Sequence, residues 1–383
     1  MKTMITTFLL PALLCCGVTN NPVPPGKPPG VYALDATALE KNKKSVAAGD
    51  AELMESYRKL LKDADKALQS PLVSVMEKKG MPPSGDKHDY MSLAPYFWPD
   101  PAKPDGLPYI RKDGQTNPEV KEYKDKEYMP ALCDDALTLG LAYYFSDNGA
   151  YAEHAAALLR TWFLDPATRM NPNLNFAQAI KGVNDGRGAG LIDSRHFVKV
   201  IDAIGLLQGS KYWKEEDQKG MQQWFADFLN WMQTSKNGIA EMNAKNNHGA
   251  WYDAQRLAMA LFTGNNELAK KIAQNAAERL DKQMDDNGSF PAEMERTISL
   301  HYTVFAMEAF FKIARMSEFT GFDFWNTTTP TGKSLKKAFE AVKPYLLQEK
   351  EWTGQQIKDF DYEEGYYLLL EGLKLLQKLN QSN

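Results

Sequence analysis

The chain has 383 residues, of which 43% are hydrophobic and 11% aromatic, and this is enough apolar material for a substantial core. Its 45 basic and 49 acidic residues are mixed along the chain and give a net charge of −4, so nucleic-acid binding has no compositional support. We therefore expect a globular protein in which an anionic ligand would require a local basic pocket.

The N-terminus has a lysine, an apolar run and a stretch rich in Pro, Gly and Asn, in the order typical of a secretory signal followed by a linker. We assign residues 1–20 to the signal peptide and 21–45 to the linker, and expect an exported protein, periplasmic or at the cell surface. Cys15 and Cys16 end the apolar run, where a lipoprotein carries its acylated cysteine. Without this segment Cys133 is alone, so neither a disulfide nor a cysteine zinc site is expected. No later apolar run is long enough to span a bilayer.

After the linker, apolar residues recur at steps of three and four, which predicts one helix after another and few strands. The expected helices cover 51–68, 134–145, 151–164, 195–207, 221–233, 249–262, 267–284, 299–316 and 362–379. Their unequal spacing favours a closed ring of helical hairpins over a solenoid, and no change in composition marks a second domain. We predict that residues 46–383 form one all-α domain, an incomplete α/α toroid with long loops lining a cleft. We expect a monomer.

Three long loops, 84–106, 171–194 and 285–297, are rich in Pro, Gly, Asn and aromatic residues, which indicates ordered functional loops. The second loop places Arg187 between glycines, which could bring its guanidinium close to an acidic sugar. Arg195 follows, either as a cleft residue or as part of an ordinary helix cap with an ion pair. The first loop carries side chains that could contact sugar rings or only pin the loop: His88, Tyr90, Tyr96 and Trp98.

The helix expected at 249–262 places a histidine beside two side-chain amides. His248 lies about 200° round from Ala250 at ~100° per residue, off the apolar stripe of this helix, and Tyr252 follows it one turn later. If Asn246 or Asn247 caps the helix, the positive helix end lies beside the imidazole and keeps it neutral, as a general base requires. The simpler alternative is an ordinary cap followed by a histidine that bonds a loop.

A second cluster lies at the start of the helix expected at 299–316. Glu293, Glu295, Arg296, His301 and Tyr302 fall within ten residues, an expensive set to bury as core. Arg296 precedes the helix and could clamp a carboxylate with its planar fork. Tyr302 could donate or accept a proton, especially if a cation lowers its pKa. The alternative is a surface ion pair of Arg296 with Glu293 or Glu295 and a tyrosine in the core.

Together the two clusters offer a neutraliser, a base, a clamp and an acid: Asn247, His248, Arg296 and Tyr302. This is the set that β-elimination from a uronic acid requires. The C5 proton is too weakly acidic until its carboxylate is neutralised, and the leaving oxygen at C4 needs a proton. If Asn and Arg supply the neutralisation, neither a metal nor a cofactor is needed.

The pairing of NNHG with ER-x3-LHY, preceded by GDKHDYMSLAPYFWPDP and NPNLNFAQAIKGVNDGRG, resembles the alginate lyase family of α/α-toroid polysaccharide lyases, from about Ala51 to the C-terminal helix. The resemblance implies an anionic polysaccharide substrate and the four catalytic residues Asn247, His248, Arg296 and Tyr302. It also implies that the tyrosine is the acid, and the base too in syn elimination, whereas the histidine is the base when the proton lies on the opposite face. We place further substrate contacts beside them at Trp251, Tyr252, Glu293 and His301.

The spacing from Arg296 to Tyr302 is one residue shorter than in the best-known bacterial members, which suggests a distinct subfamily whose substrate could be another polyuronate such as glucuronan. Two other classes stay open. A helical-ring glycoside hydrolase would need two facing carboxylates, for example Glu293 with Asp185 or Asp253. A non-catalytic glycan-binding protein would use the aromatic loops alone.

Overall fold

The computed structural model describes residues 29–381, so the predicted signal peptide and the first part of the predicted linker lie outside the described residues. The helices are α1 (Ala36–Ala47), α2 (Ala51–Ala67), α3 (Asp125–Ser146), α4 (Gly149–Leu159), α5 (Phe197–Leu207), α6 (Glu215–Thr234), α7 (Lys236–Met242), α8 (Asn247–Phe262), α9 (Asn266–Gln283), α10 (Pro291–Met294), α11 (Ser299–Ser317), α12 (Leu335–Leu346) and α13 (Tyr362–Gln381). The strands are β1 (Met91–Leu93), β2 (Phe97–Trp98), β3 (Ile110–Arg111) and β4 (Phe176–Ala179).

The prediction of an all-α toroid is confirmed, and each helix expected from the sequence has a counterpart in the structure. The expected helix 151–164 is α4 followed by a wider π turn, Arg160–Leu164. The expected helix 195–207 begins as a 3-10 segment, Gly188–His196, that leads into α5. Helices α7 and α12 were not predicted, because α7 is short and α12 follows a long Thr- and Gly-containing loop.

The linker boundary requires a correction, because α1 begins inside residues 21–45. The Asp35 side chain caps this helix by accepting from the backbone N–H of Ala38 at 3.0 Å. Val31 and Leu39 are buried against the core. The Pro- and Gly-rich composition of the preceding residues obscured this short amphipathic helix, which is stabilised by packing on the toroid.

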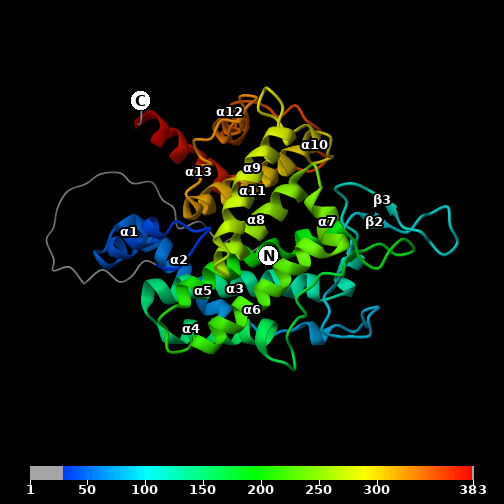
Figure 1. Cartoon of the computed structure of the whole chain (residues 1–383), viewed down its shortest axis with the longest axis horizontal. Helices are drawn as coiled ribbons and strands as arrows, with labels where there is room; N and C mark the ends of the chain where they lie inside the picture. Colours follow the sequence, from blue (N-terminus) through cyan, green and yellow to red (C-terminus); the bar gives the residue numbers. More distant parts are fainter. Residues whose placement is uncertain (1–28, 382–383) are drawn as a thin grey trace.

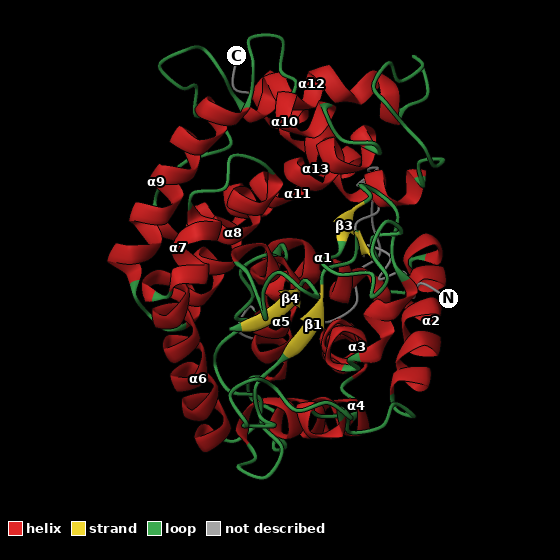
Figure 2. Cartoon of the chain, turned by 90° about the vertical axis from the view of Figure 1, so that its right-hand side faces the viewer, coloured by secondary structure: helices red, strands yellow, loops and turns green. Residues whose placement is uncertain are grey.

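Helix α8 is the central element, since it packs against α5, α6, α7, α9 and α11, while α3 packs against α4 and α5. The predicted apolar stripe of α8, from Ala250 to Leu261, is buried. Its opposite face is buried too, because α6 and α7 cover it. Between α4, α5 and α6 lies an aromatic cluster in which Trp224 stacks on Phe228 at 5.3 Å. In Figure 2 the helices surround a central axis, with α1 behind it.

The short strands gather the long loops at one end of the toroid. Strand β1 pairs in parallel with β4, so that Met91 lies opposite Phe176, and this joins loop 84–106 to loop 171–194. Strands β2 and β3 form an antiparallel hairpin in which Phe97 pairs with Arg111. Figure 1 shows this hairpin and α7 at one side of the molecule and α1 at the opposite side. None of the helices between residues 29 and 381 is both long and apolar enough to cross a membrane.

Candidate active site

A cavity of about 1290 Å³ lies within the toroid and is bordered by the long loops. Its walls come from α3, α5, α8, α11 and α13 and from the loops around β2, β3 and β4. The volume exceeds the ~300–1,000 Å³ typical of pockets for single small molecules. Most of the predicted site residues line it: Tyr90, Tyr96, Arg187, Arg195, Asn247, His248, Trp251, Arg296, His301 and Tyr302.

Asn247 is held at the first position of α8 by a buried carboxylate. Its backbone N–H donates to Glu293 Oε1 at 2.5 Å, and its Nδ2 donates to Glu293 Oε2 at 2.8 Å. Burial raises the pKa of Glu293, and the two bonds from Asn247 partly offset this. Glu293 was predicted as a substrate contact, but it lies behind Asn247 and outside the cavity lining, so this prediction is wrong. The N-cap of α8 is Asn246, whose side chain makes no capping bond.

The same helix start presents His248 to the cavity. Its Nδ1 lies 2.6 Å from Oε1 of Glu241, a buried residue of α7, which leaves Nε2 for proton chemistry. The start of α8 lies close to Ala244 and Arg279. Gly249 permits this close packing, because a Cβ there would collide with Ala244 O and the Arg279 guanidinium. The sequence interpretation considered only the charge of the helix end beside this imidazole, and the structure adds a carboxylate. This is a base-and-orienter arrangement of the kind that general-base catalysis uses.

Arg296 does not pair with either neighbouring glutamate. Its Nε and Nη2 donate to the two carboxylate oxygens of Asp113, at 3.0 and 2.8 Å, and Asp113 also accepts from Arg111 at 2.6 Å. Burial raises the pKa of Asp113, but the bonds and charge of Arg296 outweigh this and hold that pKa well below its usual value. The Arg296 guanidinium also lies 3.6 Å from the ring centroid of Tyr302. Arg296 is therefore partly committed to Asp113 and packs on the tyrosine.

The Tyr302 hydroxyl lies 2.7 Å from that of Tyr96 on the loop before β2. The sequence left open that a nearby cation lowers the pKa of Tyr302, but the net shift in the structure is in the other direction. Burial, with the neighbouring Tyr96, raises the pKa of Tyr302 far above its usual value, and the opposing effect of Arg296 is smaller. The free enzyme therefore keeps this phenol protonated at neutral pH, which suits a proton donor.

Two arginines in the cavity wall have no carboxylate within 4.0 Å in the described part of the chain. Arg187 donates from Nη2 to Gln178 Oε1 at 2.9 Å and lies over the Phe97 ring. Arg195 donates to the carbonyl of Ile192 and lies over the Phe305 ring. An anionic ligand in the cavity would therefore meet cations whose charge no salt bridge of the chain neutralises.

The predicted contact at Tyr252 is contradicted too, because its ring is fully buried outside the cavity lining and its hydroxyl donates to Met232 O at 2.9 Å. Tyr90 lines the cavity but is buried in its wall, where its hydroxyl donates to Asp193 at 3.2 Å. His88 and Trp98 lie outside the cavity lining, on the loops, and bond the backbone carbonyls of Arg169 and Gln115.

The sequence interpretation missed Glu241, Asp113 and Gln178. Glu241 precedes His248 by seven residues but belongs to a separate helix, so helical spacing does not relate the two. Asp113 lies in a turn 183 residues before Arg296. Gln178 has φ of +51°, uncommon for a residue other than glycine, and its amide donates to Asp193 at 3.0 Å. Gln178 lies in the predicted loop 171–194, whereas Asp113 lies outside all three predicted loops, so no signal in the sequence indicated it.

The carboxylates considered for a glycoside hydrolase do not line the cavity. Asp253 accepts from Arg279 at 2.6 Å and lies outside the cavity lining. Glu293 holds Asn247, and Asp185 does not line the cavity. The structure therefore brings together the elimination set and not this pair of facing acids.

The family model described as alginate lyase matches residues 74–352. The crystal structure of an alginate lyase from Bacteroides ovatus is 42% identical, with 92% of this chain and 91% of that chain covered and a TM-score of 0.85. Alginate lyase A1-III from Sphingomonas species A1 is 17% identical, with 85% of this chain and 82% of that chain covered and a TM-score of 0.53, a likeness of fold alone. No curated protein matches. The chain therefore belongs to the alginate lyase family of polysaccharide lyases.

Proposed function

We propose that this protein cleaves alginate by β-elimination, without a metal ion, and releases oligouronates with an unsaturated end. The observation that carries the proposal is that Asn247, His248 and Tyr302 meet in one cavity, each with its own partner from another segment of the chain. The alginate lyase from Bacteroides ovatus, 42% identical over nearly the whole chain, supports the choice of polymer.

In this mechanism the carboxylate of the sugar being cleaved lies between the Asn247 amide and the guanidinium groups of Arg296 and Arg187. Charge neutralisation there lowers the cost of forming a carbanion at C5. Nδ2 of Asn247 uses one hydrogen to bond Glu293 and keeps a second one, which the substrate carboxylate can accept. Glu293 fixes the orientation of that amide.

The proton and the leaving group are handled by different residues. Nε2 of His248 takes the C5 proton while Glu241 holds Nδ1. The C5–H electron pair forms the C4–C5 double bond, the C4–O bond breaks, and Tyr302 protonates the departing oxygen. Tyr96 then donates a hydrogen bond to the resulting phenolate across the 2.7 Å contact. The raised pKa of Tyr302 in the free enzyme favours His248 over Tyr302 as the base.

The test is to incubate the purified protein with polymannuronate, polyguluronate and glucuronan, with and without a chelator, and to follow the ultraviolet absorbance of the unsaturated product. Absorbance that rises on an alginate block and survives chelation supports the proposal. A rise on glucuronan alone would reassign the substrate in the way that the short interval from Arg296 to Tyr302 suggests. Reducing ends without absorbance would indicate hydrolysis and overturn elimination.

A further inference from the structure

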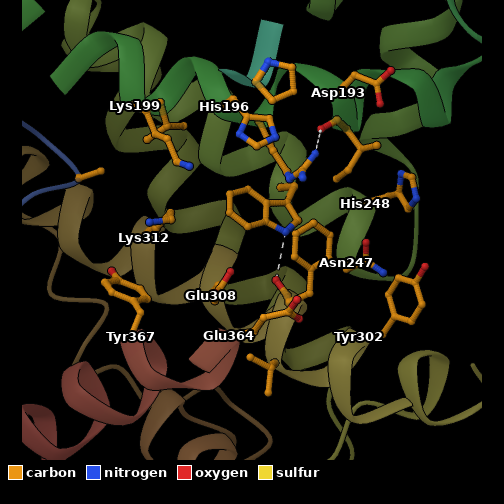
Figure 3. Close-up of a pocket in the computed structure, with 18 of the residues that line it drawn as sticks. Asp193, His196, Lys199, Asn247, His248, Tyr302, Glu308, Lys312, Glu364 and Tyr367 are labelled. Atoms are coloured by element: carbon orange, nitrogen blue, oxygen red, sulfur yellow. Dashed lines mark hydrogen bonds between the residues drawn. The ribbon is translucent and has the colours of Figure 1, made fainter. Parts of the chain in front are cut away.

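The cavity continues well beyond the catalytic residues into the toroid. Along α11 the residues that face it follow at steps of three or four: Tyr302, Phe305, Glu308, Lys312 and Arg315. At 1.5 Å per residue, the ten residues from Tyr302 to Lys312 correspond to about 15 Å of depth. Figure 3 shows Asn247, His248 and Tyr302 at one side of the pocket and Lys199, Lys312 and Tyr367 at the other.

The far end of this cavity is lined by the segment that leads into α1. Residues 30–39, which we call the N-terminal plug, contribute Ala33, Leu34 and Leu39 to the cavity wall. The buried carboxylate of Asp202 on α5 accepts hydrogen bonds from three successive backbone N–H groups of the plug, those of Tyr32, Ala33 and Leu34, at 2.7, 3.2 and 2.8 Å. The plug is therefore fastened to the toroid at this end.

The helix that carries Asp202 is shaped to receive the plug. Gly205 lies one turn further along α5, and a Cβ there would collide with the carbonyl of Gly30, so the plug backbone lies directly on this helix. On the other side Arg315 of α11 lies 3.7 Å from Asp35. A chain that passes Tyr302 toward Lys312 thus approaches the plug.

We call the deep part of the cavity the inner chamber. It contains ionisable groups, some of which have no hydrogen bond or ion pair within residues 29–381, and its lining includes His196, Lys199, Glu308, Lys312 and Tyr367. Lys199 pairs with Asp134 at 2.6 Å, and Arg315 pairs with Glu371 at 2.8 Å. In contrast, neither Lys312 nor Glu308 has a hydrogen bond or an ion pair within the described residues. The Lys312 ammonium lies 4.5 Å from the ring centroid of Tyr367. A cation, a carboxyl group and aromatic faces together match the carboxylate, hydroxyls and apolar face of a uronate.

We propose that the inner chamber binds the terminal uronate units of the polysaccharide, with Lys312 bound to a substrate carboxylate, so that the enzyme cuts at a fixed distance from a chain end. This inference rests on the proposed elimination at Tyr302. In this proposal the plug blocks the far end of the chamber, so the depth of the chamber limits the number of sugar units beyond the cleaved bond. A polymer can then be shortened only from its end.

The first experiment follows absorbance, viscosity and product size together on the preferred polyuronate at low conversion. We expect one short product size from the earliest time and a viscosity that falls slowly relative to absorbance. A broad range of sizes with an early collapse of viscosity would overturn the chamber proposal and leave the elimination intact. No absorbance on any polyuronate would overturn the proposed function, and this inference with it.

Substitutions then locate the end-binding group. Lys312→Met should lower kcat/KM on short oligouronates by about tenfold to a hundredfold, the effect of losing one charge-assisted hydrogen bond, and Lys312→Arg should restore part of it. Lys282→Met removes an exposed lysine of α9 and serves as the matched control. Asp202→Ala, checked for folding by circular dichroism, should loosen the plug and broaden the product sizes. Unchanged kinetics and product size in Lys312→Met would contradict end binding.

Discussion

The catalytic end of the cavity and the inner chamber are built from the same helices but differ in how their polar groups are satisfied. At the catalytic end His248, Asn247 and Tyr302 each have a partner at hydrogen-bond distance. In the chamber Lys312 and Glu308 have none among residues 29–381. Groups that take part in proton transfer need one fixed geometry before the substrate binds. Groups that only bind the substrate can form their hydrogen bonds with the ligand itself.

The largest effect is expected from removing the proposed acid. Tyr302→Phe should lower kcat by about a hundredfold to ten-thousandfold, because general acid catalysis at the leaving oxygen is lost while the ring and its contact with Arg296 stay. The initial rate at which the ultraviolet absorbance of the product rises, at saturating substrate, measures this loss of kcat. Tyr96→Phe is the matched control at the other end of the same hydrogen bond and should cost less. Equal losses in both variants would mean that the pair acts as one unit.

A smaller effect on activity is expected from changing Glu241, which holds the proposed base His248. Glu241→Gln should lower kcat/KM by about tenfold to a hundredfold, because the charge-assisted bond to Nδ1 of His248 is weakened. Glu241→Asp should recover part of the rate. A loss of the same size in both variants would contradict this role of the Glu241 carboxylate.

The next largest effect on activity is expected from changing Glu293, which holds the Asn247 side-chain amide. Glu293→Gln keeps the shape of the side chain but gives up one of the two carboxylate acceptors that hold Asn247, and kcat should fall about tenfold. Glu295→Gln, two residues away and outside the cavity lining, is the control. Steady-state kinetics measure kcat and KM separately. A rise in KM with kcat unchanged would show that Glu293 serves substrate binding and not the orientation of Asn247.

The smallest effect concerns stability and tests the fastening of the plug. Burial raises the pKa of Asp202 to about 6, and the bonds from the plug only partly offset this. A raised pKa means that the folded protein binds this proton more tightly, so stability falls as the pH rises from about 4 to about 6. Between pH 5 and pH 7 the loss should be about 1 kcal/mol.

Urea denaturation at several pH values measures this loss. In Asp202→Asn the slope should become shallower without vanishing, because burial also raises the pKa of Asp125 to about 6. An identical slope in the variant and the unaltered protein would show that Asp202 does not titrate in this range.

The sequence by itself determined the helical class and predicted the long loops and the candidate catalytic set. Apolar residues at helical spacing are a local property, so α8 and α11 could be located from it, and a histidine beside two asparagines at a helix start stands out without tertiary information. The two segments with the catalytic residues are each continuous in sequence, which is why they could be recognised.

Only the tertiary structure decided which partners hold these residues and where the cavity ends. Asp113 and Arg296 are 183 residues apart, and the plug meets Asp202 across about 170 residues, distances over which no periodic pattern carries information. The same reason explains the errors at Tyr252 and Glu293. A polar side chain off the apolar stripe can face a cleft or another helix, and only the packing of α6, α7 and α8 decides which.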